Sequence, residues 1–388
     1  MVEIFRQMTE EHYQIYIEHF QNLSDVKDFL MEILAIFQEL VNDSVFPADW
    51  CEMIMMQNRV ILKALRFFSR TIRDRFFETF DYQAWSNFLH SAIAFMIQPS
   101  LQLETFSPNK RAHIVKRYGD MRREMGAEIR SMWFNLGQNK LKFVPNLVGL
   151  ILEMTLIPEV ELRRATIPIF FDMMQCEFYS SRLEVESFGD TKTDSSHIKG
   201  NFNSFEDEMI AKLDTLVEGG RGDENFKNLF CEIMTNMCSK HSALNNATRF
   251  VDTITVLMER LLEYRCIIND ENKENRMSCT VNLLNFYSEI NRKEMYIRYV
   301  NKLCDLHLEC GNFTEAAYTV QLHSNLLNWS DESLPPLLKS NRYSDSNTHR
   351  QLKESLYYHI IDYYSKGLVS KIIYYIYRSV KWFSLWFL

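Results

Sequence analysis

The chain has 388 residues, of which 46% are hydrophobic, and it contains only 11 Gly and 8 Pro. This composition excludes an intrinsically disordered chain and a fold rich in β-turns, and the length exceeds that of one ordinary domain. A formal net charge of −8 and an isoelectric point near 5.8 argue against a general nucleic-acid-binding protein, so we predict no nucleic-acid partner.

Residues 1–135 read as a succession of amphipathic helices separated by short polar breaks. The clearest pattern spans residues 26–41, where apolar side chains recur every three or four positions: Phe29, Leu30, Ile33, Leu34 and Phe37. Comparable patterns cover residues 1–21, 50–68, 72–80, 81–96 and 111–135. Such units are typical of armadillo- and HEAT-like stacking, so we predict an all-α fold that begins with an α-solenoid over residues 1–250.

The middle of the chain is less regular. The apolar run IPIFFDMMQCEF, residues 167–178, could form a buried helix or, taken alone, a short strand, and its helical surroundings favour a helix. Residues 180–204 are rich in Ser, Asp, Thr, Lys and Asn, so we predict a mobile surface loop there, to which no phosphorylation site is assigned. Helical patterns return at residues 205–217, 226–241 and 247–267.

Residues 277–329 contain three consecutive amphipathic helix patterns. The second ends at Gly311, since glycine readily adopts the left-handed conformation that closes a helix. Thr314 is a candidate N-cap for the third, in which Ala316 and Ala317 are small enough for a neighbouring helix to approach closely. The sequence GNFTEAAYT is thus typical of the turn in a tetratricopeptide-type (TPR) hairpin, and we predict a TPR-like helical lobe here.

The amino-acid sequence of this segment identifies a protein family more specifically than its periodicity does. Residues 270–330, DENKENRMSCTVNLLNFYSEINRKEMYIRYVNKLCDLHLECGNFTEAAYTVQLHSNLLNWS, closely resemble the start of the DOCKER exchange domain of the DOCK (dedicator of cytokinesis) family, in its Rac-activating branch. Residues 116–137, 151–178 and 217–227 resemble the helical-repeat region that precedes that domain. The resemblance covers about residues 25–367 and follows the family's order.

This resemblance implies a fragment of a guanine nucleotide exchange factor for Rho-family, Rac-type GTPases. Residues 1–250 would be the armadillo-like region, and residues 265–367 would be an incomplete first lobe of the DOCKER domain, which family members use to support the catalytic lobes and to dimerise. We therefore expect a homodimer through this lobe, with contacts to be sought between Tyr287 and Leu327. Core packing explains the same apolar stripes equally well.

The resemblance also implies what lies outside this chain. The catalytic lobes, the lipid-binding C2-like module and the N-terminal SH3 region that binds an ELMO-type adaptor would belong to the complete protein. A Rac-type GTPase would be engaged only by that complete protein, which we expect in the cytoplasm with recruitment to the plasma membrane. The chain alone is expected to have no enzymatic activity.

No pattern in the sequence carries chemistry by itself. The eight cysteines form no C-x-x-C pair, as suits a reduced cytosolic protein, and no histidine has the spacing of a metal-ligand set. The loop with Gly219, Gly220 and Gly222 lacks the Lys-Ser/Thr of a phosphate-binding loop, and Arg221-Gly222-Asp223 reads as a turn. We predict no catalytic, cofactor-binding or metal-binding residues and no cofactor, and we interpret two basic clusters as solvated helix faces: Arg70, Arg73 and Arg75, and Lys116, Arg117, Arg122 and Arg123.

The last 21 residues, 368–388, depart from the family pattern and are rich in aromatic and aliphatic residues. Lys371, Arg378 and Lys381 would each cost about 2.5 to 3.5 kcal/mol near the centre of a bilayer. This tail is an interfacial helix or, as we favour, translated non-coding or alternatively spliced sequence. The alternative to the fragment hypothesis is a stand-alone α-solenoid scaffold, or a dominant-interfering isoform, anchored to membranes by this tail.

Overall fold

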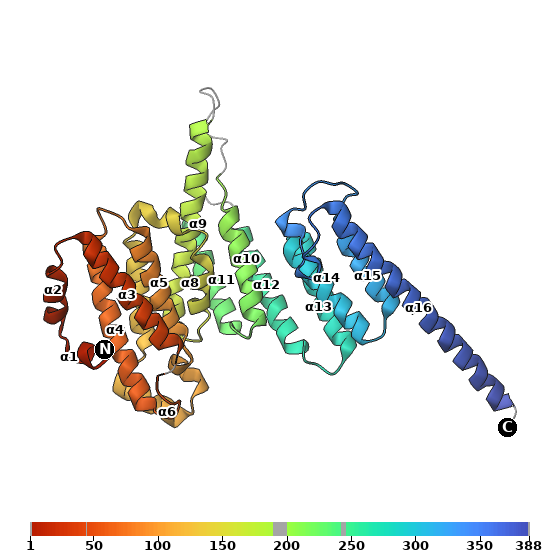
Figure 1. Ribbon diagram of the computed structural model, residues 1–388, viewed down its shortest axis with the longest axis horizontal. Coiled ribbons are helices and arrows are strands. Elements are labelled where there is room, and N and C mark those ends of the chain that lie inside the picture. Colours follow the sequence, from red (N-terminus) through yellow and green to blue (C-terminus); the bar gives the residue numbers. More distant parts are fainter. Residues whose placement is uncertain (1, 44, 189–199, 242–245, 387–388) are drawn as a thin grey trace. The chain divides into compact units, whose positions relative to one another are not determined.

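The computed structural model describes residues 2–43, 45–188, 200–241 and 246–386, with the backbone alone for Val2, Asn341 and residues 183–188 and 369–386. Over these ranges the fold is built from helices, and the sole pairing of extended residues is an isolated bridge between Ser333 and Thr348. The all-α prediction is therefore confirmed. The chain divides into two compact units, Met1–Thr255 and Val256–Leu388, and the division falls within α12 (Ala247–Ile267) (Figure 1).

The first unit is a solenoid of two helix layers. In one layer α3 packs on α5, α5 on α8 and α8 on α10, and in the other α4 packs on α7, α7 on α9 and α9 on α11. Each layer thus takes every second major helix, which is the geometry of stacked helical hairpins. The helices are α1 (Val2–Gln7), α2 (Glu10–Glu18), α3 (Leu23–Asn42), α4 (Cys51–Arg75), α5 (Tyr82–Ile97), α6 (Pro108–Tyr118), α7 (Met121–Phe134), α8 (Val148–Thr155), α9 (Val160–Phe188), α10 (Asn203–Glu218) and α11 (Glu224–Lys240). Short 3-10 turns occupy Pro99–Leu101, Leu103–Thr105 and Gly137–Phe143.

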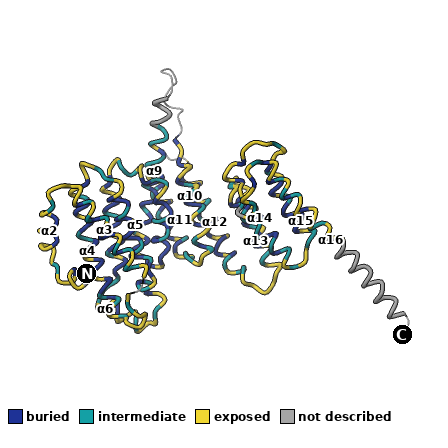
Figure 2. The backbone as a smooth tube through the Cα atoms, viewed as in Figure 1, coloured by how far each residue is buried: buried dark blue, intermediate teal, exposed yellow. Residues whose placement is uncertain are grey.

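Large aromatic side chains contribute to the core of this unit, and Figure 2 shows the buried positions along its helices. Trp85 and Trp133 are almost wholly buried, yet both indole N–H groups are satisfied. Trp85 donates to the carbonyl oxygen of Phe76 at 3.3 Å, and Trp133 donates to the carboxylate of Asp172 at 2.7 Å. The core therefore gains aromatic burial without an unpaired polar atom at either ring.

Three predicted boundaries differ from the structure. The predicted helices at residues 50–68 and 72–80 are joined in one helix, α4, because no breaker separates them and Ile72 is fully buried, and this helix ends at Arg75, so residues 76–80 form a turn. The pattern at residues 111–135 is interrupted at Gly119, whose φ of 72° ends α6, and Asp120 then caps α7. The loop expected over residues 180–204 is helical at both ends, because α9 continues to Phe188 and α10 begins at Asn203, and residues 189–199 lie outside the described part of the chain.

The second unit is a series of antiparallel helices in which each packs on the next: α13 (Lys273–Glu289), α14 (Lys293–Glu309), α15 (Phe313–Ser324) and α16 (His349–Trp386). Between α15 and α16 the chain forms 3-10 turns at Pro336–Leu338 and Asn341–Tyr343. Ala316 and Ala317 are fully buried, so the predicted close approach of helices is present. Gly311 has a φ of 71°, as the closing turn of α14 requires.

The predicted cap at Thr314 is wrong. The residue before α15 is Asn312, whose side chain makes no capping hydrogen bond, and Thr314 lies within the first turn of the helix. Of the aromatic tail, the structure describes a helical backbone as far as Trp386, so the prediction about its side chains lies outside the described residues. Within the described part of the chain, none of the helices combines the length and the apolarity needed to cross a bilayer.

Candidate functional site

The apolar stripes between Tyr287 and Leu327 form the core of the second unit. Tyr287 and Tyr299 are fully buried and stack on each other with ring centroids 5.4 Å apart. Val320 and Leu327 belong to the buried cluster that joins α14, α15 and α16. These side chains pack within the chain, so they are not available for contact with a second molecule. Apolar periodicity identifies a helix face that is buried. It does not show whether the residues that cover this face belong to the same chain or to a second molecule.

A different apolar surface lies on the outer side of α15 and α16. Tyr318, Trp329 and Ile361 are each more than half exposed, at 59%, 56% and 60%, and Leu368 is 62% exposed. Tyr318 contacts Tyr364 edge to face at 5.4 Å between ring centroids, and Trp329 contacts Tyr357 at 5.5 Å. We call this surface the α15–α16 face and define it by Tyr318, Leu322, Trp329, Tyr357, Ile361, Tyr364 and Leu368.

The α16 part of this face follows helical geometry. Tyr357, Ile361, Tyr364 and Leu368 are separated by four, three and four residues, so they lie on one side of the helix. Leu352, Leu356 and Ile360 form the adjacent, buried side, and Tyr357 and Tyr364 pack partly against the same buried cluster. The apolar surface of the helix is thus wider than its buried part, and Ile361 and Leu368 lie on the exposed edge. Apolar faces of this kind on helical repeats are frequent contact surfaces for other chains.

A close approach at Gly367 sets the position of α16 against α15. A Cβ atom at residue 367 would lie 2.7 Å from the hydroxyl oxygen of Thr314 and 3.3 Å from its backbone nitrogen. Glycine therefore lets the two helices meet at the start of α15. The α15–α16 face depends on this approach because Tyr318 and Tyr364 are each one turn from the contact.

The first unit contains two buried arginines that the sequence reading missed. Arg122 is only 1% exposed and bonds the carboxylates of both Glu104 and Asp120 at 2.7 to 3.0 Å. Burial disfavours its charge, but these bonds outweigh burial and raise the pKa of Arg122 above its usual value. The interpretation of this residue as part of a solvated face is therefore wrong. No local signal separates it from its exposed neighbour Arg123.

The Arg221-Gly222-Asp223 triplet is a structural turn. Arg221 pairs with Glu153 at 2.6 Å, while Asp223 caps α11 by accepting from the backbone N–H of Phe226 at 2.8 Å. The same Asp223 carboxylate accepts two bonds from the buried Arg163. Burial acts to raise its pKa, but the Arg163 guanidinium and the backbone N–H groups lower the pKa of Asp223 below its ordinary value. Both charged side chains of the triplet are engaged within the unit.

The histidines of the second unit are separate from one another, and the described residues contain no cluster of His, Cys, Asp and Glu able to hold a metal ion. His323 is fully buried, and its Nε2 lies 3.3 Å from the carbonyl oxygen of Leu338. Burial lowers the pKa of His323, which keeps the ring neutral near pH 7. Its position in the core indicates a packing role.

Two family models match the chain in succession. Residues 1–233, more than half of the chain, match the "Dedicator of cytokinesis (DOCK) TPR region", and residues 278–348 match "DHR-2, Lobe A". The chain belongs to the DOCK family. The first match lies within the first unit and the second within the second unit. The family description of the repeats is TPR, whereas the sequence reading favoured armadillo or HEAT repeats.

Complete DOCK proteins are much longer than this chain. It is 41% identical over 370 residues to "Dedicator of cytokinesis protein 4" of Homo sapiens and 40% identical over 380 residues to "Dedicator of cytokinesis protein 3" of the same organism. Each alignment covers 95% of the chain but only 18% of the relative. The mouse form of "Dedicator of cytokinesis protein 3" matches equally, at 40% identity. The DOCK resemblance read from the sequence is thereby confirmed.

Proposed function

We propose that this chain is the helical scaffold of a guanine nucleotide exchange factor for Rac-type GTPases, comprising the repeat region and the first lobe of the exchange domain. The observation that carries the proposal is the order of the two family matches along one chain, each within one compact unit. The geometry of the chain is that of a structural scaffold. Its buried charges are paired across helices, and its described residues hold no metal-ligand cluster.

An exchange assay tests this proposal. The purified 388-residue chain is mixed with a Rac-type GTPase loaded with fluorescent GDP, and nucleotide release is followed against the GTPase alone. We expect no acceleration. Added in excess to a complete DOCK exchange factor, the chain should instead slow exchange by replacing one full-length subunit. Release of GDP by the chain alone contradicts the proposal, and so does the absence of any effect on the complete factor.

The scaffold would self-associate through the α15–α16 face. Tyr318, Trp329 and Ile361 combine large exposed apolar area with rings already held in place by Tyr364 and Tyr357, so little side-chain entropy is lost on contact. Tyr318 and Leu322 of this face lie within the range from Tyr287 to Leu327 in which the dimer contact is expected, and they take the place of its buried stripes in the proposed contact. The proposal includes a homodimer through this lobe. It also includes binding of a Rac-type GTPase and an ELMO-type adaptor by the complete protein, and a cytoplasmic location with recruitment to the plasma membrane.

A further inference from the structure

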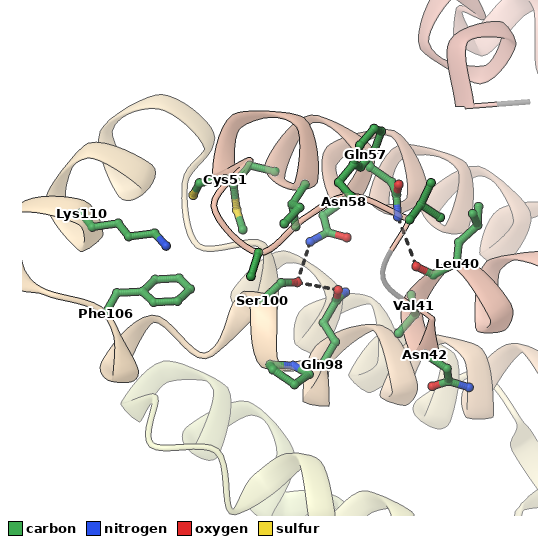
Figure 3. A pocket seen from close by; sticks show the side chains of 16 residues that line it. Leu40, Val41, Asn42, Cys51, Gln57, Asn58, Gln98, Ser100, Phe106 and Lys110 are labelled. Carbon is green, nitrogen blue, oxygen red and sulfur yellow. Dashed lines mark hydrogen bonds between the residues drawn. The ribbon is translucent and has the colours of Figure 1, made fainter.

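A cavity of about 350 Å³ opens in the first unit between the C-terminal ends of α3 and α5, the first half of α4 and the start of α6 (Figure 3). Leu40, Val41, Ile54 and Phe106 line it and are only half-buried, so they leave apolar surface that an occupant can reach. Most of the sixteen lining residues are apolar: Leu40, Val41, Val45, Phe46, Ala48, Cys51, Ile54, Met55, Pro99 and Phe106.

The buried polar side chains of the wall are bonded within the wall. Gln57 Nε2 donates to the carbonyl oxygen of Leu40 at 3.1 Å. Asn58 Nδ2 donates to Ser100 Oγ at 3.0 Å, and Ser100 in turn donates to Gln98 Oε1 at 2.6 Å. The side-chain oxygen atoms of Gln57 and Asn58 have almost no accessible surface. These amides therefore shape the wall without offering a hydrogen bond to a ligand.

Lys110 is the single charged residue among those that line the cavity. In the part of the chain that the structure describes it has no carboxylate partner, and its Nζ lies 4.2 Å from the centre of the Phe106 ring. Lys110 is also in the first turn of α6, where the helix dipole favours a negative charge. The site therefore combines apolar walls with one positive charge that is available to an anion.

This charge is at one end of the cavity. Lys110 and Phe106 lie at one end, and Val41 and Asn42 lie at the other (Figure 3). The complementary ligand has one negative charge at one end and an apolar body that leads away from it. A fatty acid has both features, and its flexible chain can follow walls that are built from several helices. The volume is at the lower end of the range for ligand pockets, so it accommodates a single small molecule.

We propose that this cavity binds one fatty acid molecule. The carboxylate pairs with Lys110, and the acyl chain packs along Leu40, Val41 and Ile54. Apolar surface that is open to water in the free protein is covered on binding, which supplies most of the affinity, while the charge pair sets the orientation of the ligand. The site goes beyond the scaffold function and does not depend on it.

Isothermal titration calorimetry on the complete 388-residue chain tests the proposal. Octanoate, decanoate and dodecanoate are titrated below their micelle concentrations, and each added CH₂ group should strengthen binding about 4-fold until the cavity is full. Decanol, which has the same chain as decanoate but no charge, should bind about 10-fold more weakly than decanoate.

A charge variant tests the role of Lys110 without disturbing the core. Lys110→Met should remove the preference for decanoate over decanol and should leave the affinity for decanol unaltered, because the apolar walls are intact. Lys116→Met is the matched control, since it makes the same change on the same helix at a residue that does not line the cavity. It should keep the preference. An equal loss of preference in both variants would mean that the anion does not bind at Lys110.

A variant that fills the cavity tests where the chain binds. Ile54→Trp should weaken dodecanoate at least about 10-fold, because the larger ring occupies the space of several CH₂ groups. Met53→Trp is its control, since Met53 is 37% exposed and does not line the cavity, and circular dichroism should show unchanged helicity in both variants. Equal affinities of the two variants, no binding of any fatty acid, or binding to anionic phospholipid vesicles without binding of free dodecanoate would each overturn the proposal.

Discussion

Arg163 on α9 donates two parallel hydrogen bonds to Asp223, the N-cap of α11, with Nη1–Oδ1 at 2.8 Å and Nη2–Oδ2 at 2.9 Å. Arg163 is 1% exposed and also donates to the carbonyl oxygens of Thr155 and Leu156 at the end of α8. One side chain thus joins three helices of the solenoid. The 60 residues between the two partners place them in successive repeats.

Asp223→Ala should lower the free energy of unfolding of the first unit by about 2 to 3 kcal/mol. The substitution removes a helix cap, at about 1 kcal/mol, and leaves a buried guanidinium without its carboxylate, a cost that the partial exposure of Asp223 reduces. Urea denaturation followed by circular dichroism measures the change. Asp362→Ala, which breaks an exposed pair with Lys366, is the control and should change stability by less than about 0.5 kcal/mol.

The contribution of Asp223 to the stability of the first unit should also depend on pH. Since its folded-state pKa is lowered below the ordinary 3.8, the stabilisation is fully present above that value and is lost as pH falls through the folded pKa. The stability difference between the natural protein and Asp223→Ala should therefore be constant from pH 7 to pH 5 and shrink below about pH 3.8. A difference that stays the same down to pH 2 would show that the pair contributes nothing through its charge.

The burial of His323 predicts that the stability of the second unit depends on pH. Its pKa is lowered by burial, so the unfolded chain binds its proton at a higher pH than the folded chain does. Stability should fall as pH drops below the ordinary histidine value of 6.5, until the folded pKa is reached. Hydrogen exchange of α15 amides at pH 7.5 and 5.5 measures this. His323→Leu, which cannot titrate, should lose less protection on acidification, and equal losses would contradict the prediction.

Gly367→Ala should destabilise the second unit by about 1 to 3 kcal/mol, although alanine normally stabilises a helix relative to glycine by up to about 1 kcal/mol. The added Cβ would meet the Thr314 hydroxyl at 2.7 Å and force α16 away from α15. Thermal unfolding of the single variants and of Gly367→Ala with Thr314→Ala measures the coupling. The second substitution should restore part of the loss. A stabilised Gly367→Ala variant would mean that the helices do not approach closely here.

Ile361→Glu should weaken self-association of the chain by at least about 10-fold, because it places a charge in the proposed contact. Sedimentation equilibrium gives the monomer–dimer constant. Ile15→Glu, on the comparably exposed Ile15 of α2, makes the same change away from the α15–α16 face and should leave the constant unaltered. Equal effects of the two variants, or a natural protein that is monomeric at all concentrations, would exclude the proposed contact.

The sequence by itself determined the helical class, most helix positions and the family. Helix periodicity is a local property, and the long ordered resemblance over residues 270–330 identifies the family without any knowledge of packing. Burial of Arg122 and Arg163, the outward position of Ile361 and the cavity beside Asn58 appear only in the tertiary structure. Each depends on residues far apart in the chain, such as Arg163 and Asp223 or Asn58 and Ser100. The spacing of residues along one helix does not show which of its apolar or charged faces a distant helix will cover. Contacts between helices decide which face is buried.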